Sequence, residues 1–267
     1  MQNIKLATPD GFILDADYYS GKGERGVVFV HGATIARNDE PPLVQAATKL
    51  AEGGIHTLAF DFRGHGKSSG DSAKDPSIEG ELTDLETAIH YLRDQGVTKI
   101  GIVAASFGAS IAALHVARHH DEVAALLLSN PVLNYTTAFF EPTTELSRQF
   151  FGHAHKVLET EDHVVLPWNN FRMGRRIFDD MKSHDPLVAL QKYKGPLLII
   201  HGDADKDISF DDCQRFYAAL SNPQRAFLAV QGGKHAFRDE PHTTDVANAI
   251  VNFFSRELGV HPVRSVV

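Results

Sequence analysis

The chain has 267 residues, a formal net charge of −8 and a hydrophobic share of 43%, values typical of a globular protein. This acidic balance leaves no basic stripe for phosphates and argues against nucleic acid or an anionic membrane surface as a partner. No basic N-terminal segment precedes an apolar run, and no apolar stretch reaches the roughly 18 residues of a membrane span, so we expect a cytoplasmic protein without membrane insertion.

Short apolar runs recur along the chain and alternate with stretches of helical spacing. Each run is continuous rather than alternating, which is typical of strands covered on both faces. The predicted strands are residues 27–30, 57–60, 100–105, 124–129, 197–200 and 226–230. Strands separated by helices form a mostly parallel central sheet flanked by helices, so we expect an α/β fold in a single domain over residues 1–267.

The first two predicted strands are each followed by a glycine-containing loop. His31, Gly32 and Ala33 follow the first strand, and residues 61–68 (DFRGHGKS) follow the second. The carboxyl ends of parallel strands meet at one edge of a sheet, where ligands bind. We therefore expect the first of these loops to be able to aim a backbone N–H group at a ligand bound there.

Ser106 lies where the strand 100–105 turns into a helix. Small residues two positions before and two positions after a nucleophilic serine let strand and helix pack closely, and the turn exposes the serine hydroxyl. Ala104 and Gly108 occupy these positions, so the pattern departs from G-x-S-x-G by one methyl group. The alternative is that Ser106 only caps the helix that begins near Phe107.

The alternation of strands and helices is interrupted at residues 131–186. A structureless loop of that length is uncommon in a compact domain, so we expect a small helical or mixed cap subdomain over one end of the sheet. Its aromatic residues either line an acyl pocket or form the cap's own core, and we expect Tyr135 and Trp168 to contact substrate. The aromatic residues considered are Tyr135, Phe139, Phe140, Phe150, Phe151 and Trp168.

An acid and a base follow the last two predicted strands. Asp203 and Asp205 follow residues 197–200, and we favour Asp205 because it lies further into the loop. His235 follows Gly232 and Gly233, whose flexible backbone can place an imidazole over the serine. The order serine, acid, histidine is that of α/β-hydrolases.

These residues predict nucleophilic catalysis by Ser106, His235 and Asp205. A serine hydroxyl is a weak nucleophile until a base takes its proton, and the base needs a carboxylate to orient it. The backbone N–H groups of Ala33 and Phe107 are the predicted oxyanion hole. Thr34, next to Ala33, is a further predicted substrate contact.

The chain resembles the α/β-hydrolase superfamily over essentially its whole length, and residues 59–68 match the D-x-R-G-x-G-x-S stretch of that family. The resemblance implies an α/β-hydrolase fold with a cap inserted after the sixth strand, and structural roles for Asp61, Arg63 and His65. Within the superfamily, the layout is similar to that of the cinnamoyl or feruloyl esterase-like group, and bacterial acyl-thioesterases share it.

We therefore expect a serine hydrolase that cleaves carboxylic esters of aromatic (cinnamoyl-type) or medium acyl groups through an acyl-enzyme on Ser106. One alternative is an acyl-thioesterase, and another is a non-catalytic ligand-binding protein on a hydrolase scaffold. The expected partner is a small-molecule ester or thioester, and a homodimer is compatible with the sequence.

Cysteine and histidine patterns give no sign of a metal site. Cys213 is the only cysteine and is expected to pack inside a helix that begins at Ser209. None of the fifteen histidines belongs to an HExxH motif or a Cys/His ligand spacing. We expect neither a metal nor a cofactor.

Overall fold

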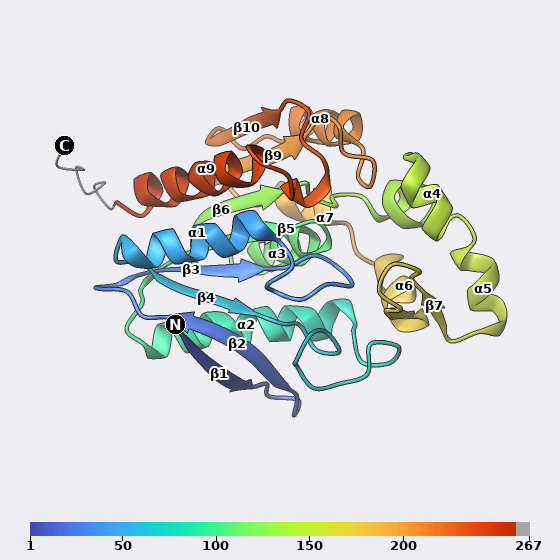
Figure 1. The fold of residues 1–267 in the computed structure, drawn as a ribbon, viewed down its shortest axis with the longest axis horizontal. Coiled ribbons are helices and arrows are strands. Elements are labelled where there is room, and N and C mark those ends of the chain that lie inside the picture. The colour runs from blue at the N-terminus through green and yellow to red at the C-terminus, as the bar shows by residue number, and fades with distance from the viewer. Residues whose placement is uncertain (260–267) are drawn as a thin grey trace.

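A computed structural model describes residues 1–259 and contains an eight-stranded sheet in the order β1-β2-β4-β3-β5-β6-β9-β10 (Figure 1). The strands are β1 (Gln2–Ala7), β2 (Ile13–Tyr19), β3 (Arg25–Val30), β4 (His56–Phe60), β5 (Lys99–Ala105), β6 (Val123–Ser129), β9 (Leu197–Gly202) and β10 (Arg225–Val230). All pairs from β4 to β10 are parallel, and only β1 and β2 run antiparallel to their neighbours. The predicted fold class is confirmed.

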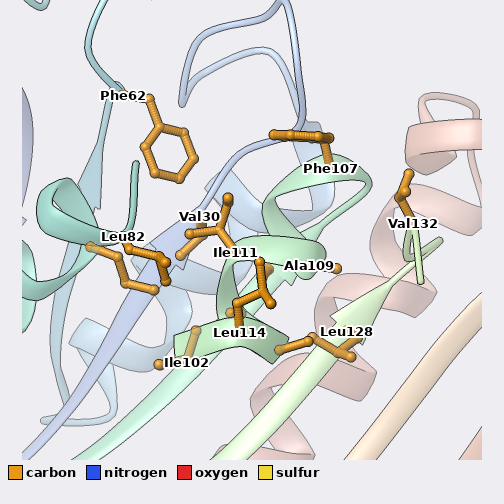
Figure 2. Packing of buried hydrophobic residues seen from close by; sticks show 14 of the residues in the cluster. Val30, Phe62, Leu82, Ile102, Phe107, Ala109, Ile111, Leu114, Leu128 and Val132 are labelled. Atoms are coloured by element: carbon orange, nitrogen blue, oxygen red, sulfur yellow. The ribbon is translucent and has the colours of Figure 1, made fainter. Parts of the chain in front are cut away.

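Helices cover both faces of the sheet. On one face α1 (Pro41–Glu52) packs against α9 (His242–Glu257), and Figure 1 shows these two helices side by side. The opposite face carries α2 (Ile78–Asp94), α3 (Phe107–Arg118), α7 (Pro186–Leu190) and α8 (Phe210–Ala219). Figure 2 shows Ile111 and Leu114 of α3 packing with Val30, Ile102 and Leu128 from three adjacent strands. The burial of these apolar faces holds the carboxyl ends of the strands in place.

Side-chain caps begin two of the helices, one of which is the helix predicted to begin at Ser209. Asp185 accepts a hydrogen bond from the backbone N–H of Val188 at the start of α7, and Ser209 accepts one from Asp212 at the start of α8. Cys213 is buried in α8, as predicted.

At both edges of the sheet the structure departs from the sequence prediction, although residues 226–230 do form the predicted strand. Strands β1 and β2 were not predicted, and β2 carries Asp15 and Asp17, which both form ion pairs with Arg37 from a distant loop, while Asp15 also pairs with Lys5 of β1. Residues 226–230 were predicted to be covered on both faces, but β10 is an edge strand whose residues are only partly buried or exposed. An apolar run fits an edge strand as well, because one face of such a strand still packs.

The segment between β6 and α7 is a mixture of short helices and a two-stranded hairpin. Figure 1 shows α4, α5, α6 and β7 grouped beyond the carboxyl ends of the central strands. Within the group, Phe139 packs edge-on against Phe151 with ring centroids 4.8 Å apart. Its elements are η1 (Thr136–Phe140), α4 (Glu145–Phe151), α5 (Ala154–Thr160), β7 (His163–Val165), β8 (Arg172–Gly174) and α6 (Arg175–Met181).

Within residues 1–259, none of the helices combines the length and the apolar character needed to cross a membrane.

Candidate active site

Ser106 occupies a strained turn between β5 and α3. Its φ of 50° and ψ of −120° lie in a region that side-chain-bearing residues rarely adopt, and holding them there costs about 1–3 kcal/mol. Neighbouring backbone approaches closely: a Cβ at position 108 would lie 2.3 Å from the carbonyl oxygen of His31, so Gly108 is required. The surrounding structure therefore holds the half-buried serine at the edge of the sheet, where it lines a cavity.

His235 lies between Ser106 and Asp205. Its Nε2 is 3.1 Å from the Oγ of Ser106, and its Nδ1 is 2.8 Å from the Oδ2 of Asp205. The residue opens the short helix η2 (His235–Phe237), in which Ala236 has a φ of 61°. The structure thus brings the three predicted residues into one hydrogen-bonded chain.

Asp205, and not Asp203, is the carboxylate at His235. Its side chain is fully buried, and its Oδ1 accepts hydrogen bonds from the backbone N–H groups of Asp207 and Ile208. Burial alone would raise the pKa of Asp205, but His235 and His201 hold that pKa well below its usual range. Asp203 instead accepts a bond from the backbone of the loop before His235.

The electrostatic surroundings of His235 favour its protonated form. Burial alone would lower the pKa of this imidazole, whereas the carboxylates of Asp205, Asp207 and Glu40 raise it to about 9. Two of these acids, Asp207 and Glu40, line the adjoining cavity. The base is therefore surrounded by groups that stabilise the positive charge it gains when it takes a proton.

The backbone N–H groups of Ala33 and Phe107 are the ones predicted to stabilise a negatively charged oxygen beside Ser106. Phe107 is the first residue of α3, where N–H groups have no partner within the helix and the helix dipole favours an anion. Neither the N–H of Phe107 nor that of Ala33 donates to another group within residues 1–259. Both residues line the same cavity as Ser106.

A cavity of about 360 Å³ opens above Ser106 and His235. Its walls come from the insertion as well as from the sheet, and they include Phe139, Phe150 and Trp168. Trp168 is 49% exposed and packs edge-on against Phe150, with ring centroids 4.4 Å apart. The hydroxyl therefore faces a space that suits an apolar or aromatic group.

Two of the three residues predicted to contact substrate line this cavity, and the third does not. Thr34 and Trp168 line it. Tyr135 does not: its ring is buried behind Phe107 at a centroid distance of 5.7 Å, and its hydroxyl has no partner among the described residues. The expected substrate contact of Tyr135 was wrong because an aromatic residue early in the insertion packs inward against α3.

Three charged residues of the cavity were missed by the sequence analysis. These are Glu40, Asp207 and Arg238. Glu40 is 2% exposed, its Oε2 has no partner among residues 1–259, and burial raises its pKa to about 7. Nothing in the sequence around Glu40 distinguishes it from a surface carboxylate before a helix.

The D-x-R-G-x-G-x-S stretch has a structural role in the loop after β4. Arg63 binds Asp84 and Asp10, and Asp61 accepts hydrogen bonds from Arg37. His65 is buried with its Nδ1 2.9 Å from the carbonyl oxygen of Arg63. These contacts tie the loop after β4 to its neighbours and leave none of its side chains at Ser106.

Three side chains of the site have the geometry of a metal-binding group. Ligand atoms of Asp205, Asp207 and His235 lie within 4.8 Å of one another. The Nδ1 of His235 and the Oδ2 of Asp205 already bind each other, so a cation here would have to break that hydrogen bond.

Comparisons with known proteins place the chain among hydrolases. The family model described as serine aminopeptidase, S33, matches residues 22–189, more than half of the chain. The uncharacterized protein YfhR of Salmonella typhimurium is 26% identical over 219 residues, which are 77% of this chain and 63% of YfhR. The bifunctional esterase/perhydrolase DCH of Acinetobacter calcoaceticus is 26% identical over 275 residues, 89% of this chain and 92% of DCH. The chain spans only 51% of human ABHD12B, another relative.

Solved structures share the fold at low sequence identity. Est1E of Butyrivibrio proteoclasticus, solved with ferulic acid bound, superimposes with a TM-score of 0.79 at 22% identity, covering 96% of this chain and 99% of Est1E. The complex of DcsB with a substrate analogue gives a TM-score of 0.77 at 18% identity, with 96% and 99% coverage. From the match of its family model, the chain belongs to the serine aminopeptidase S33 (Hydrolase_4) family of α/β-hydrolases.

Proposed function

We propose that this protein is a serine esterase in which Ser106 is the nucleophile, His235 the general base and Asp205 the acid that orients it. The observation that carries the proposal is the hydrogen-bonded chain from Ser106 through His235 to Asp205, which lies beside Ala33, Phe107 and a largely apolar cavity.

The first half of the reaction would form an acyl-enzyme. The Nε2 of His235 takes the proton of the Ser106 hydroxyl as its oxygen attacks the carbonyl carbon of the ester. The N–H groups of Ala33 and Phe107 stabilise the resulting oxyanion, an interaction that typically contributes about 3–4 kcal/mol for each donor. The imidazolium then gives its proton to the departing alcohol, and the C–O bond to the alcohol breaks.

The second half returns the enzyme to its starting state. Water loses a proton to His235 and attacks the acyl carbon, and the same N–H groups stabilise the second oxyanion. Collapse of this intermediate breaks the bond to Ser106, whose oxygen recovers its proton from His235. The charge of Asp205 stabilises the imidazolium in both halves.

The cavity favours an aromatic or medium-length acyl group. Its aromatic wall lies within the insertion, and Trp168 is its largest partly exposed side chain. The similarity to the bifunctional esterase/perhydrolase DCH supports an ester substrate, and the ferulic acid bound to the structural relative Est1E is compatible with an aromatic acid.

A second candidate is an aminopeptidase, the activity that names the family. Such an enzyme must bind a positively charged amino terminus, and the carboxylates of Glu40 and Asp207 line the cavity. The esterase remains our first choice because Arg238 shares that wall and because burial shifts the pKa of Glu40 upward, toward its neutral form.

A substrate panel tests the proposal. It contains p-nitrophenyl esters of increasing acyl length, methyl hydroxycinnamates, acyl-CoA thioesters and aminoacyl anilides, and kcat/KM is compared across them. We expect esters to exceed the other classes by more than about tenfold, or 1.4 kcal/mol in transition-state free energy. A preference of that size for thioesters or for anilides would replace the esterase assignment.

Labelling by a fluorophosphonate probe tests the nucleophile directly. The wild-type protein and the control Ser183→Ala, which changes an exposed serine at the end of α6, should be labelled. Ser106→Ala should not be labelled. Unlabelled wild-type protein that still binds ligand would favour a non-catalytic binding protein.

A further inference from the structure

A second group of chemistry-bearing side chains lies between α2 and α3, outside the candidate active site. Glu86 is on α2, His115 is on α3, and His119 caps the end of α3. One ligand atom from each lies within 4.8 Å of the other two. The Oε1 of Glu86 is 3.9 Å from the Nδ1 of His115 and 3.3 Å from the Nε2 of His119.

His115 is the unusual member of this group. It is 3% exposed, and its Nδ1 is buried without a hydrogen-bond partner among residues 1–259. Leaving a buried polar atom unpaired costs about 1–3 kcal/mol. The atom faces the Glu86 carboxylate at a distance too long for a hydrogen bond. A metal ion between the Nδ1 of His115 and the carboxylate of Glu86 would give both groups a partner.

The hydrogen-bond partner of His119 fits the same role. Its Nδ1 lies 3.2 Å from the carboxylate of Glu122, and Glu122 is itself held by Arg93. When Nδ1 donates its proton to Glu122, the lone pair of Nε2 is free to point at Glu86. Histidines that bind metals usually donate their other N–H to such a carboxylate, which fixes the tautomer.

We propose that Glu86, His115 and His119 bind a divalent transition-metal ion, for which zinc is the best match. Two imidazole nitrogens and one carboxylate oxygen are a common zinc donor set, and ligand atoms about 2.0–2.2 Å from a tetrahedral ion lie about 3.4 Å apart. The two distances from Glu86 are close to this separation. A water molecule completes the shell on the exposed side, and the ion clamps α2 to α3.

The site was invisible in the sequence for a simple reason. His115 and His119 are four residues apart, so they share one face of a helix. A pair alone is a common surface pattern, and the third ligand comes from another helix, 29 positions before His115. Only the packing of α2 against α3 brings Glu86 to the pair.

The test is calorimetric titration of the chelator-treated full-length protein with zinc chloride, alongside its thermal unfolding with and without zinc. Glu86→Gln and His119→Ala each remove one ligand and should weaken zinc binding at least tenfold. Glu122→Gln removes the support of His119 and should weaken it about tenfold. His120→Ala, a change of the adjacent exposed histidine, is the matched control and should bind zinc like the wild type.

The rival explanation is that His119 is an imidazolium that only bridges Glu86 and Glu122. It predicts no zinc binding that depends on Glu86 and His119, and that result would overturn the proposal. Ester hydrolysis measured in parallel separates this site from the active site. Zinc at His235 would inhibit the reaction, whereas zinc between α2 and α3 should raise the melting temperature and leave the rate unchanged. A zinc effect confined to inhibition also contradicts the proposal.

Discussion

His201 lies directly behind Asp205, with its Nε2 3.3 Å from the same Oδ2 that accepts the hydrogen bond of His235. The side chains of His201 and Asp205 are both fully buried. The carboxylate is therefore held between two imidazoles, and the inner imidazole helps to keep its pKa low. His201 is a positioning residue, since it reaches the serine only through Asp205 and His235.

His201→Leu should lower kcat/KM about tenfold and the free energy of unfolding by about 1–3 kcal/mol, because the buried Asp205 carboxylate loses the imidazole beside it and the carbonyl oxygen of Ile208 loses a hydrogen bond. Steady-state kinetics and denaturant unfolding measure the two effects. His56→Leu is the control, because it also breaks a buried hydrogen bond, to Tyr18, far from the site. Equal losses of activity in both variants would reduce the role of His201 to stability alone.

Strain at Ser106 should be visible as a trade-off between stability and activity. Both Ser106→Gly and Ser106→Ala should lower kcat by at least about a thousandfold. Glycine accepts the positive φ of this position without a Cβ penalty, although it loses more entropy on folding. We expect the glycine variant to exceed the alanine variant by about 1 kcal/mol in free energy of unfolding. Equal stabilities would show that the turn is relaxed.

The sequence was most informative about features that depend on residues within a few positions of one another. The continuous apolar runs of the central strands and the small residues around Ser106 follow from packing within a few positions. They predict both the parallel sheet and the turn that the structure shows. The loop position of Asp205, beyond Asp203, similarly agrees with its contact to His235.

The sequence was least informative where the pairing or burial of a residue depends on segments far from it along the chain. Strand β2 places Asp15 and Asp17 in buried positions, where Arg37 reaches both from the loop after β3 and Lys5 of β1 also pairs with Asp15. The burial of Glu40 depends on the same kind of long-range packing. Neither pairing nor burial of this sort leaves a periodic signal in the residues concerned.

Glu40→Gln should stabilise the protein at high pH only. The pKa of Glu40 is about 7 in the folded state against 4.5 for an ordinary glutamate, so the folded state holds its proton more tightly. The resulting destabilisation is absent below pH 4.5, grows up to about pH 7 and is constant above it. The gain from the substitution should approach about 3 kcal/mol at pH 8 and vanish at pH 4.

The control for this experiment is Glu52→Gln, which changes an exposed glutamate at the end of α1. Denaturant unfolding at the two pH values measures both variants. A gain from Glu40→Gln that is the same at pH 4 and pH 8 would contradict a raised pKa.

The pH dependence of ester hydrolysis should report the charge around His235. The imidazole must be neutral to act as a base, and its pKa is raised, so kcat/KM should continue to rise above pH 7. Asp205→Asn removes the main stabilising charge and should shift this rise to lower pH while lowering the maximum about ten-thousandfold. Glu40→Gln should shift it in the same direction with a much smaller loss. A profile already level at pH 6 in the wild type would argue against the raised pKa.

Trp168 should determine the preference for aromatic acyl groups. Its ring forms part of the cavity wall and is supported by Phe150, so Trp168→Ala removes a surface on which an aromatic acyl group can pack. We expect kcat/KM for methyl hydroxycinnamates to fall about five- to tenfold, equivalent to about 1 kcal/mol of lost aromatic contact. p-Nitrophenyl acetate, whose acyl group is too short to reach the ring, should be hydrolysed at an unchanged rate. Trp168→Phe keeps an aromatic surface and should restore most of the loss. An equal loss for both esters would mean that the tryptophan supports the insertion as a whole and does not select the acyl group.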